Sequence, residues 1–321
     1  MFIEAFKTTY GAILELVVLG AVGFFIVKKN YVNDEGARVL SGLVIGLFLP
    51  CLMFSEIVRR FDFKAYPEWW MLPIYSLLLT FAWYACGSLV MACDKSLKKN
   101  PGEFLSICSF QNSGYLPLPL AASLLPQGRA EDMYILIFLF LLGFNMTIFS
   151  VGIVMLTRSK EQHFDYKHMF NAPVISTLLA LALVFFNLNK SIPEHVMKPI
   201  DILGRCAVPL SILVVGGNLA SIKLTQGLEL RPLSWGLLIK LVILPLIFIG
   251  FVLVSGVNKM LGLLLILQSA MPPAALLSVI SKSHNQGARL INQAIFYGHI
   301  LCIITIPIFL AIFWSVSGKS F

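Results

Sequence analysis

Residues 110–120 read Phe-Gln-Asn-Ser-Gly-Tyr-Leu-Pro-Leu-Pro-Leu and lie in the middle of an apolar span from about residue 104 to residue 125. This span is long enough to cross a membrane as one helix. Pro117 and Pro119 lack backbone N–H groups, however, and Gly114 allows the chain to leave helical geometry. Because an unpaired backbone group is costly in lipid, such a break is tolerated only where protein or a water-filled cavity surrounds it.

Three polar residues, Gln111, Asn112 and Ser113, coincide with this expected break. One interpretation is a proline-kinked helix that serves only for packing, since prolines are ordinary in membrane helices. The other is a discontinuous helix whose polar side chains face a cavity and hold a substrate, as in many secondary transporters.

The composition indicates a helical membrane protein. Of the 321 residues, 58% are hydrophobic and only 12% are charged, and the mean hydropathy is +0.85. The apolar runs are continuous and about 20 residues long, unlike the ten-residue alternation of a membrane barrel. The net charge of +8 falls mostly between these runs. The basic residues are therefore expected to set topology and contact lipid headgroups, and no nucleic-acid partner is expected.

Ten membrane spans are expected, and a short connector divides them five and five. The first repeat occupies residues 1–157, the cytoplasmic connector residues 158–171, and the second repeat residues 172–321. Lys28 and Lys29 follow the first span, so the pattern is that of a retained helix and not of a cleaved secretory signal. The spans are expected at residues 11–27, 39–58, 69–92, 104–125, 133–156, 173–188, 200–222, 233–254, 261–280 and 295–314.

Ten spans place both termini on the same side of the membrane. If the termini lie outside, the inner loops hold 13 basic residues and the outer segments hold nine. This bias predicts outside termini in a multi-pass protein.

The two halves of the chain show matches in the same order. Phe48-Leu49-Pro50 matches Ala207-Val208-Pro209 at an offset of 159, and Gly143 matches Gly298 at an offset of 155. Residues 111–113 match residues 268–270 at an offset of 157, and Pro272 and Pro273 follow. Because each half has an odd number of spans, the second copy must be inverted. Paired broken helices in inverted repeats favour a transport site near the bilayer midplane.

Broken helices predict an anion site. The N-terminal ends of half-helices expose free N–H groups and a partial positive charge, which hold an anion without a basic side chain. We therefore expect a small organic anion, most simply a carboxylate. The candidate binding residues are Gln111, Asn112, Ser113, Gly114, Pro117, Pro119, Gln268, Ser269, Pro272 and Pro273. Neither break has an acidic residue beside it, so no metal site is expected there, although backbone carbonyls and hydroxyls remain possible ligands for sodium.

Few charged residues fall inside the expected spans. Lys240 lies about eight residues into the eighth span and is expected to face the protein interior, as a coupling or charge-compensating group. Its alternative roles are attracting the anion, replacing a bound cation, or pairing with a structural partner. Glu15 and Arg205 are close enough to span ends to reach water.

Other motifs are absent or ambiguous. The sequence has no His-Glu-x-x-His, Gly-x-Ser-x-Gly or phosphate-loop motif, so neither an enzyme nor an ATP-driven pump is expected. The six cysteines lie mostly in apolar runs, and the five histidines are scattered. Asn218, after Gly216-Gly217, is consistent either with a break in the seventh span or with close helix packing at the glycines.

These motifs resemble those of the auxin efflux carrier family, which includes plant PIN proteins and bacterial malate and malonate permeases. Residues 110–120 are similar to its fourth-helix crossover, with Asn112 and Pro119-Leu120 on the motif and Pro117 where a glycine is usual. Residues 267–273 look like the matching ninth-helix crossover, and Phe48-Leu-Pro50 and Ile304-Thr-Ile-Pro307 are similar to further signatures. The resemblance covers essentially the whole chain.

The resemblance implies an all-α membrane protein of ten helices in two inverted five-helix repeats, with crossover helices 4 and 9. It implies a scaffold domain of helices 1, 2, 6 and 7, a transport domain with an elevator-like movement, and a homodimer. The short connector resembles bacterial members, which implies the inner membrane. The expected function is secondary transport of small organic anions, with no cofactor and with a proton or sodium as the possible coupling ion. The alternatives are a sodium-coupled symporter of the bile-acid type and a non-transporting sensor or channel.

Overall fold

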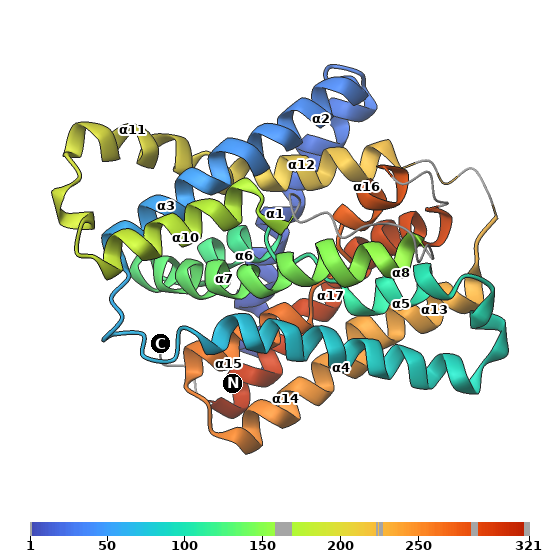
Figure 1. Ribbon diagram of the computed structural model, residues 1–321. Helices are drawn as coiled ribbons and strands as arrows, with labels where there is room; N and C mark the ends of the chain where they lie inside the picture. The colour runs from blue at the N-terminus through green and yellow to red at the C-terminus, as the bar shows by residue number, and fades with distance from the viewer. Residues whose placement is uncertain (1, 158–168, 223, 225–226, 284–287, 318–321) are drawn as a thin grey trace.

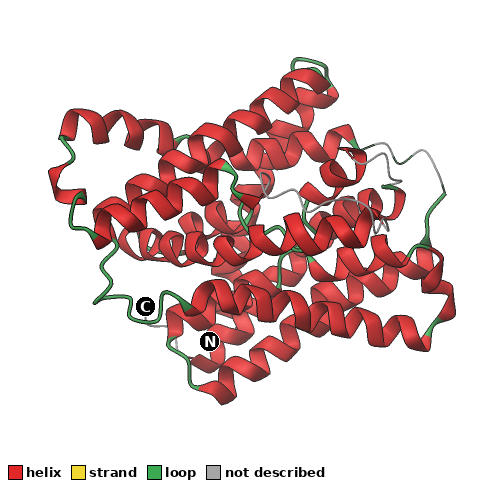
Figure 2. Cartoon of the chain, viewed as in Figure 1, coloured by secondary structure: helices red, strands yellow, loops and turns green. Residues whose placement is uncertain are grey.

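The computed structural model describes residues 2–157, 169–222, 224, 227–283 and 288–317. Nearly all of these residues lie in helices (Figures 1 and 2). Most of the connector at residues 158–171 lies outside the described residues. The helices are α1 (Phe2–Lys28), α2 (Asp34–Leu43), η1 (Val44–Phe48), α3 (Leu49–Arg60), α4 (Met71–Cys93), η2 (Lys95–Lys99), α5 (Pro101–Ser109), α6 (Pro117–Leu124), α7 (Gln127–Thr147), η3 (Ile148–Gly152), α8 (Ile153–Thr157), α10 (Ala172–Phe185), η4 (Asn189–Ser191), α11 (Glu194–Arg205), α12 (Ala207–Ser221), α13 (Leu230–Leu238), η5 (Ile239–Ile243), α14 (Leu244–Ser255), α15 (Lys259–Ser269), α16 (Leu276–Ser283) and α17 (Arg289–Ser317).

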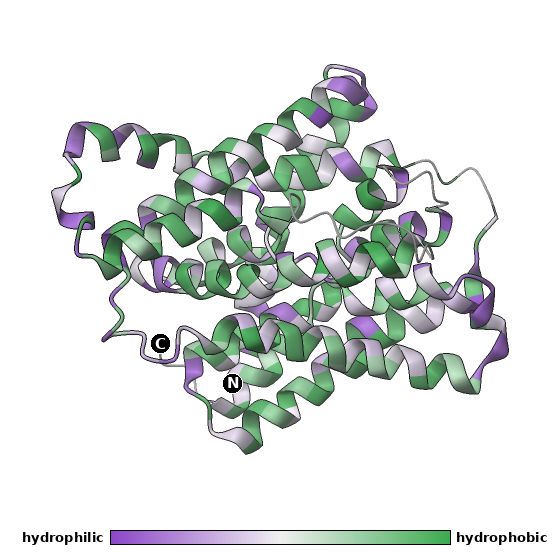
Figure 3. Ribbon diagram, viewed as in Figure 1, coloured by the Kyte–Doolittle hydropathy of each residue, from purple (hydrophilic) through white to green (hydrophobic). Residues whose placement is uncertain are grey.

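The helices confirm the helical membrane class. Among the described residues, 7 helical stretches are long and apolar enough to cross a membrane. Large apolar side chains such as Val18, Leu78 and Val254 are exposed on their surfaces, and apolar residues cover most of the helical ribbon in Figure 3. Such surfaces are suited to a lipid solvent. The stretches are Phe2–Lys28, Asp34–Arg60, Met71–Cys93, Gln127–Thr157, Glu194–Ser221, Leu230–Ser255 and Arg289–Ser317.

Prolines accompany three of the distortions in the long helices. The π-helical turn η1 lies immediately before Pro50, and η5 lies just before Pro245. α11 and α12 are separated at Cys206, three residues before Pro209. Proline lacks an N–H group and its ring crowds the carbonyl four residues earlier, so the preceding turn must widen or bend.

Glycines hold α1 against α12. A Cβ atom added to Gly216 would lie 1.9 Å from the carbonyl oxygen of Gly20, and one added to Gly23 would lie 2.2 Å from that of Leu213. The two helices therefore pack backbone to backbone, as small residues allow in membranes. α12 continues unbroken past Asn218, which confirms the packing interpretation of the two glycines and excludes a break there.

α7 forms the interior of the molecule. Its residues from Met133 to Phe144 are all buried, and it runs through the middle of the bundle (Figure 1). α1 and α17 are antiparallel neighbours, because Thr9 contacts the carbonyl of Pro307 while Gly20 and Ile300 line the same cavity. The start of α1 and the end of α17 therefore lie at the same end of this helix pair.

Candidate functional site

Two helices are interrupted at the places where the sequence has paired prolines. α5 ends at Ser109 and α6 begins at Pro117, and α15 ends at Ser269 while α16 begins at Leu276. Phe110 leaves α5 in an extended conformation, with φ −114° and ψ 119°. Because Pro117, Pro119, Pro272 and Pro273 have no N–H groups, neither segment completes a helical hydrogen-bond ladder. The expected break at residues 110–120 and its partner at 267–273 are thus both present.

The two interruptions meet. The N–H of Asn112 donates to the carbonyl of Pro272 at 2.8 Å, and the N–H of Ala274 donates to the carbonyl of Phe110 at 3.1 Å. Gln111 and Pro273 lie opposite each other in this short antiparallel bridge. These hydrogen bonds pair backbone groups of one broken helix with those of the other, which lowers the free-energy cost of the two breaks inside a membrane.

The bridge defines which residues of the two breaks lie opposite each other. The two residues that donate, Asn112 and Ala274, are 162 positions apart in the sequence, and so are the two that accept, Phe110 and Pro272. The sequence match at an offset of 157 pairs Gln111 with Gln268, whereas the residue opposite Gln111 in the bridge is Pro273. The match followed the shared glutamines, whereas the backbone is aligned by the extended residues beside the prolines.

Most of the polar side chains at the crossing are buried but only partly bonded. Gln268 donates through Nε2 to the carbonyl of Ser113 at 3.1 Å, and Ser269 donates to the carbonyl of Ile266 within its own helix. Both amide atoms of Gln111, the hydroxyl of Ser113 and Oε1 of Gln268 have no partner among the described residues. Buried polar atoms without partners are costly, so their retention at one point suggests an interaction with a solute.

Free backbone donors lie before α6 and not within it. Pro117 and Pro119 contribute none, and the N–H groups of Leu118 and Leu120 donate to the carbonyls of Gly114 and Leu116. In the described part of the chain, no acceptor contacts the N–H groups of residues 113–116. This four-residue segment therefore carries the free backbone donors of the break, the kind of group that can bind an anion.

Gly114 does not use the conformational freedom that the sequence suggested. Among the described glycines only Gly256 has a positive φ, and a Cβ on Gly114 would make an ordinary 3.6 Å contact with Leu141. The break therefore depends on the prolines. Gly298 is more tightly packed against the crossing, because a Cβ there would lie 2.8 Å from Cδ of Pro273.

His299 contacts the crossing and was not among the expected site residues. Its Nδ1 lies 2.8 Å from the carbonyl oxygen of Ile295, and its Nε2 lies 3.3 Å from Nδ2 of Asn112. A carbonyl oxygen only accepts, so Nδ1 carries the proton and Nε2 accepts from the Asn112 amide. No spacing in the sequence joins these two residues. The available signal was an ionisable side chain inside an apolar span.

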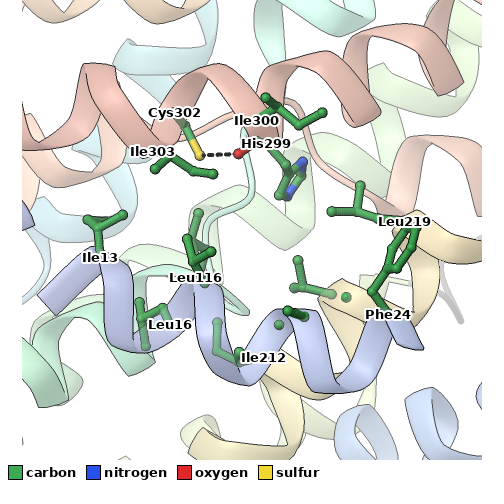
Figure 4. Close-up of a pocket in the computed structure, with 15 residues that line it drawn as sticks. Ile13, Leu16, Phe24, Leu116, Ile212, Leu219, His299, Ile300, Cys302 and Ile303 are labelled. Atoms are coloured by element: carbon green, nitrogen blue, oxygen red, sulfur yellow. Dashed lines mark hydrogen bonds between the residues drawn. The ribbon is translucent and has the colours of Figure 1, made fainter. Parts of the chain in front are cut away.

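A cavity of about 210 Å³ opens beside His299. Its walls come from α1, α12 and α17, and Leu116 of the first break also lines it (Figure 4). Almost all of the lining side chains are apolar, and the His299 ring points into the space (Figure 4). A polar crossing and an apolar cavity therefore share one boundary, formed by Leu116 and His299.

Lys240 is fully buried, as its place in the eighth span predicted. It lies in the π-helical turn η5, and its Nζ donates to the carbonyl of Cys108 at 3.2 Å. Nζ also lies 3.4 Å from the centroid of the Trp83 ring, in a cation–π arrangement. None of the ion pairs in the described residues includes Lys240. Its Nζ instead contacts the carboxyl end of α5, immediately before the first break, where a helix favours a positive group.

Glu15 and Arg205 lie away from the crossing. Both side chains are exposed, and Glu15 accepts a 2.9 Å hydrogen bond from Ser123 of α6. The described residues contain no cluster of three or more histidine, cysteine, aspartate or glutamate side chains able to hold a metal ion.

Known proteins resemble this chain along nearly its whole length. A family described as membrane transport proteins matches residues 8–167 and 157–310. Protein PIN-LIKES 2 of Arabidopsis thaliana is 21% identical over 96% of this chain and 94% of its own length. An uncharacterized transporter of Methanothermobacter thermautotrophicus is 22% identical over 95% and 96%, and one of Methanocaldococcus jannaschii is 24% identical over 88% and 92%.

Proposed function

The chain belongs to the membrane transport protein family, the auxin efflux carriers that its sequence resembles, and from this premise we propose that it is a secondary carrier of small organic anions. As a member of a family of transporters it is a multi-pass membrane transport protein and not an enzyme.

The meeting of the two broken helices is the observation that carries the proposal. The crossing combines unpaired backbone N–H groups at residues 113–116 with the buried, unpartnered amide of Gln111. Its described residues include no carboxylate that would repel an anion, and Nζ of the buried Lys240 lies at the carboxyl end of α5, next to the break. Such a set of donors suits a carboxylate.

The neighbouring cavity suggests the rest of the substrate. Its lining is apolar except where His299 enters. A carboxylate that binds at the crossing would direct the remainder of its carbon skeleton into this space, so a short apolar body is favoured over a second charge.

The proposed architecture is ten spans in two inverted repeats. The seven long helical stretches, α10 and the two interrupted pairs α5–α6 and α15–α16 would together supply ten. The reciprocal hydrogen bonds at the crossing support an approximate two-fold relation between the breaks. We assign α1, α2–α3, α10 and α11–α12 to a scaffold, and the broken helices to a transport domain with an elevator-like movement. We further propose that the protein is a homodimer in a bacterial inner membrane, with both termini outside.

The coupling ion is proposed to be a proton rather than sodium. A hard cation prefers oxygen ligands, and the Cys108 carbonyl at the end of α5 already receives the Lys240 ammonium. A sodium-coupled symporter is the alternative that this arrangement opposes.

Uptake into proteoliposomes tests the function. The purified full-length chain would be given labelled malate, malonate or benzoate, with and without sodium. We expect saturable uptake of at least one acid, independent of sodium, and its loss in Gln111→Leu but not in the exposed control Gln127→Leu. Failure of all three acids to show saturable uptake would overturn the proposal, sodium dependence would favour the symporter, and steady currents far above carrier rates would indicate a channel.

A further inference from the structure

The hydrogen bonds of His299 fix which of its nitrogens can bind a proton. Nδ1 donates to the Ile295 carbonyl within α17, so Nε2 is the nitrogen that can bind a further proton. Nε2 faces the side-chain amide of Asn112 at the centre of the first break. A proton that binds the ring must therefore arrive at the atom that contacts the candidate anion site.

Protonation of Nε2 would reverse this hydrogen bond. An imidazolium donates from both nitrogens, so Asn112 would have to turn its amide and present Oδ1 to the ring. The amide NH₂ group would then be released as a donor on the side away from His299. One proton would thus add a positive charge beside the crossing and free a hydrogen-bond donor there, and both changes favour an anion.

Few other titratable groups face His299. Of the described side chains that line the cavity, Cys302 is the other titratable one, and its thiol donates to the His299 carbonyl at 3.1 Å. On the other elements that pack against α17, Glu4, Lys7 and Lys28 of α1 and Lys259 of α15 are exposed. The remaining charged groups are bonded elsewhere or exposed. They include Lys240 of η5 on Cys108, Glu103 of α5 on the N–H groups of Leu290 and Ile291, Arg231 of α13 on Asp94, and Glu15 of α1 on Ser123, while Lys282 of α16 is exposed.

An isolated imidazolium would be costly beside so apolar a cavity, and a bound carboxylate would offset that cost. We infer that His299 is the proton-binding group of a proton–anion cotransporter, and that it acts by reorienting Asn112. This inference rests on the proposed carrier function and names its coupling ion and the residue that carries it. Proton and anion then raise each other's affinity by the same factor.

Calorimetry of anion binding tests the coupling without transport. The detergent-solubilised full-length protein would be titrated with malate, malonate or benzoate, at a pH where the probe is fully ionised, in buffers of different ionisation enthalpy. The difference between buffers counts protons taken up. We expect about one proton per anion for the unmodified protein, none for His299→Gln, and about one for His195→Gln, whose exposed side chain on α11 provides the control.

If His299→Gln does not fold, the pH dependence of anion binding by the unmodified protein tests the inference. Its affinity for the bound probe is expected to weaken by about tenfold per pH unit once the free imidazole is deprotonated. Anion binding with no proton uptake and no pH dependence would leave the carrier proposal standing and overturn this one. Proton uptake that persists in a folded His299→Gln variant would also overturn it, and failure of every probe to bind would overturn both.

Discussion

Gln111 and Pro273 lie opposite each other where two broken helices cross, and a backbone hydrogen bond closes the bridge on each side of the pair. Proline cannot donate, and the side chain of Gln111 has no partner among the described residues. At the bridge itself the backbone is therefore paired, while the side chain of Gln111 is not. This division suggests that the backbone holds the shape and that the side chains are kept for a solute.

Replacing Gln111 with leucine separates these two roles. The change removes a buried amide whose missing partners cost about 1–3 kcal/mol, so the thermal unfolding midpoint in detergent is expected to stay the same or rise. Uptake of the transported acid is expected to fall at least tenfold, because a hydrogen-bonding group is lost. A variant that is less stable but transports normally would instead assign Gln111 a structural role.

Adding one methyl group at Gly298 should disturb the second break. In Gly298→Ala the new Cβ would lie 2.8 Å from Cδ of Pro273 and 3.3 Å from a methyl group of Leu237. A proline ring cannot rotate away, so we expect a loss of about 1–3 kcal/mol in unfolding free energy together with reduced uptake. Gly250→Ala is the matched control, since no atom lies within 4 Å of its added Cβ. Equal behaviour of the two variants would show that the contact with Pro273 is unimportant.

Hydrophobicity and proline placement predicted the helices well, but not their ends. The second span was expected at residues 39–58 and the helical stretch is Asp34–Arg60. The fifth was expected at 133–156 and the stretch is Gln127–Thr157. An apolar window marks only the part of a helix that needs lipid, whereas helical hydrogen bonds continue into polar surroundings until a cap or a loop ends them.

The site was predicted less completely, for a physical reason. Paired prolines and polar residues identified both breaks, because proline acts locally on the backbone. The contact between Asn112 and His299 joins residues 187 positions apart, and no local rule relates them. The bridge between Gln111 and Pro273 could not be predicted either, because a match between similar side chains does not determine which backbone groups pair.

Asp94 provides a pH-dependent contact outside the spans. Its carboxylate accepts from the backbone and hydroxyl of Ser96 and from Arg231 at 2.7 Å. These bonds, chiefly those from Ser96, hold the pKa of Asp94 below its ordinary value. A lowered pKa in the folded state adds stability above the ordinary value, and that stability is lost as the pH falls through the lowered value.

Asp94→Asn is therefore expected to lower the unfolding midpoint near neutral pH, and the difference from the unmodified protein should shrink on acidification. Melting curves over a pH series measure this. A difference that stays constant down to strongly acidic pH would contradict the assignment.

Lys240→Met tests the buried charge beside the first break. Methionine has a similar length and apolar character, but it leaves the Cys108 carbonyl without its donor and the Trp83 ring without its cation. We expect the protein to fold, since replacing a buried charge by an apolar side chain is often tolerated, and we expect uptake to fall at least tenfold because the end of α5 is no longer fixed. Lys64→Met, at an exposed loop position, is the control.

Unchanged uptake and expression in Lys240→Met would remove this residue from the mechanism. Uptake that is restored by sodium would show that the ammonium occupies the place of a bound cation, because a free ion could then bind the vacated carbonyl at the carboxyl end of α5.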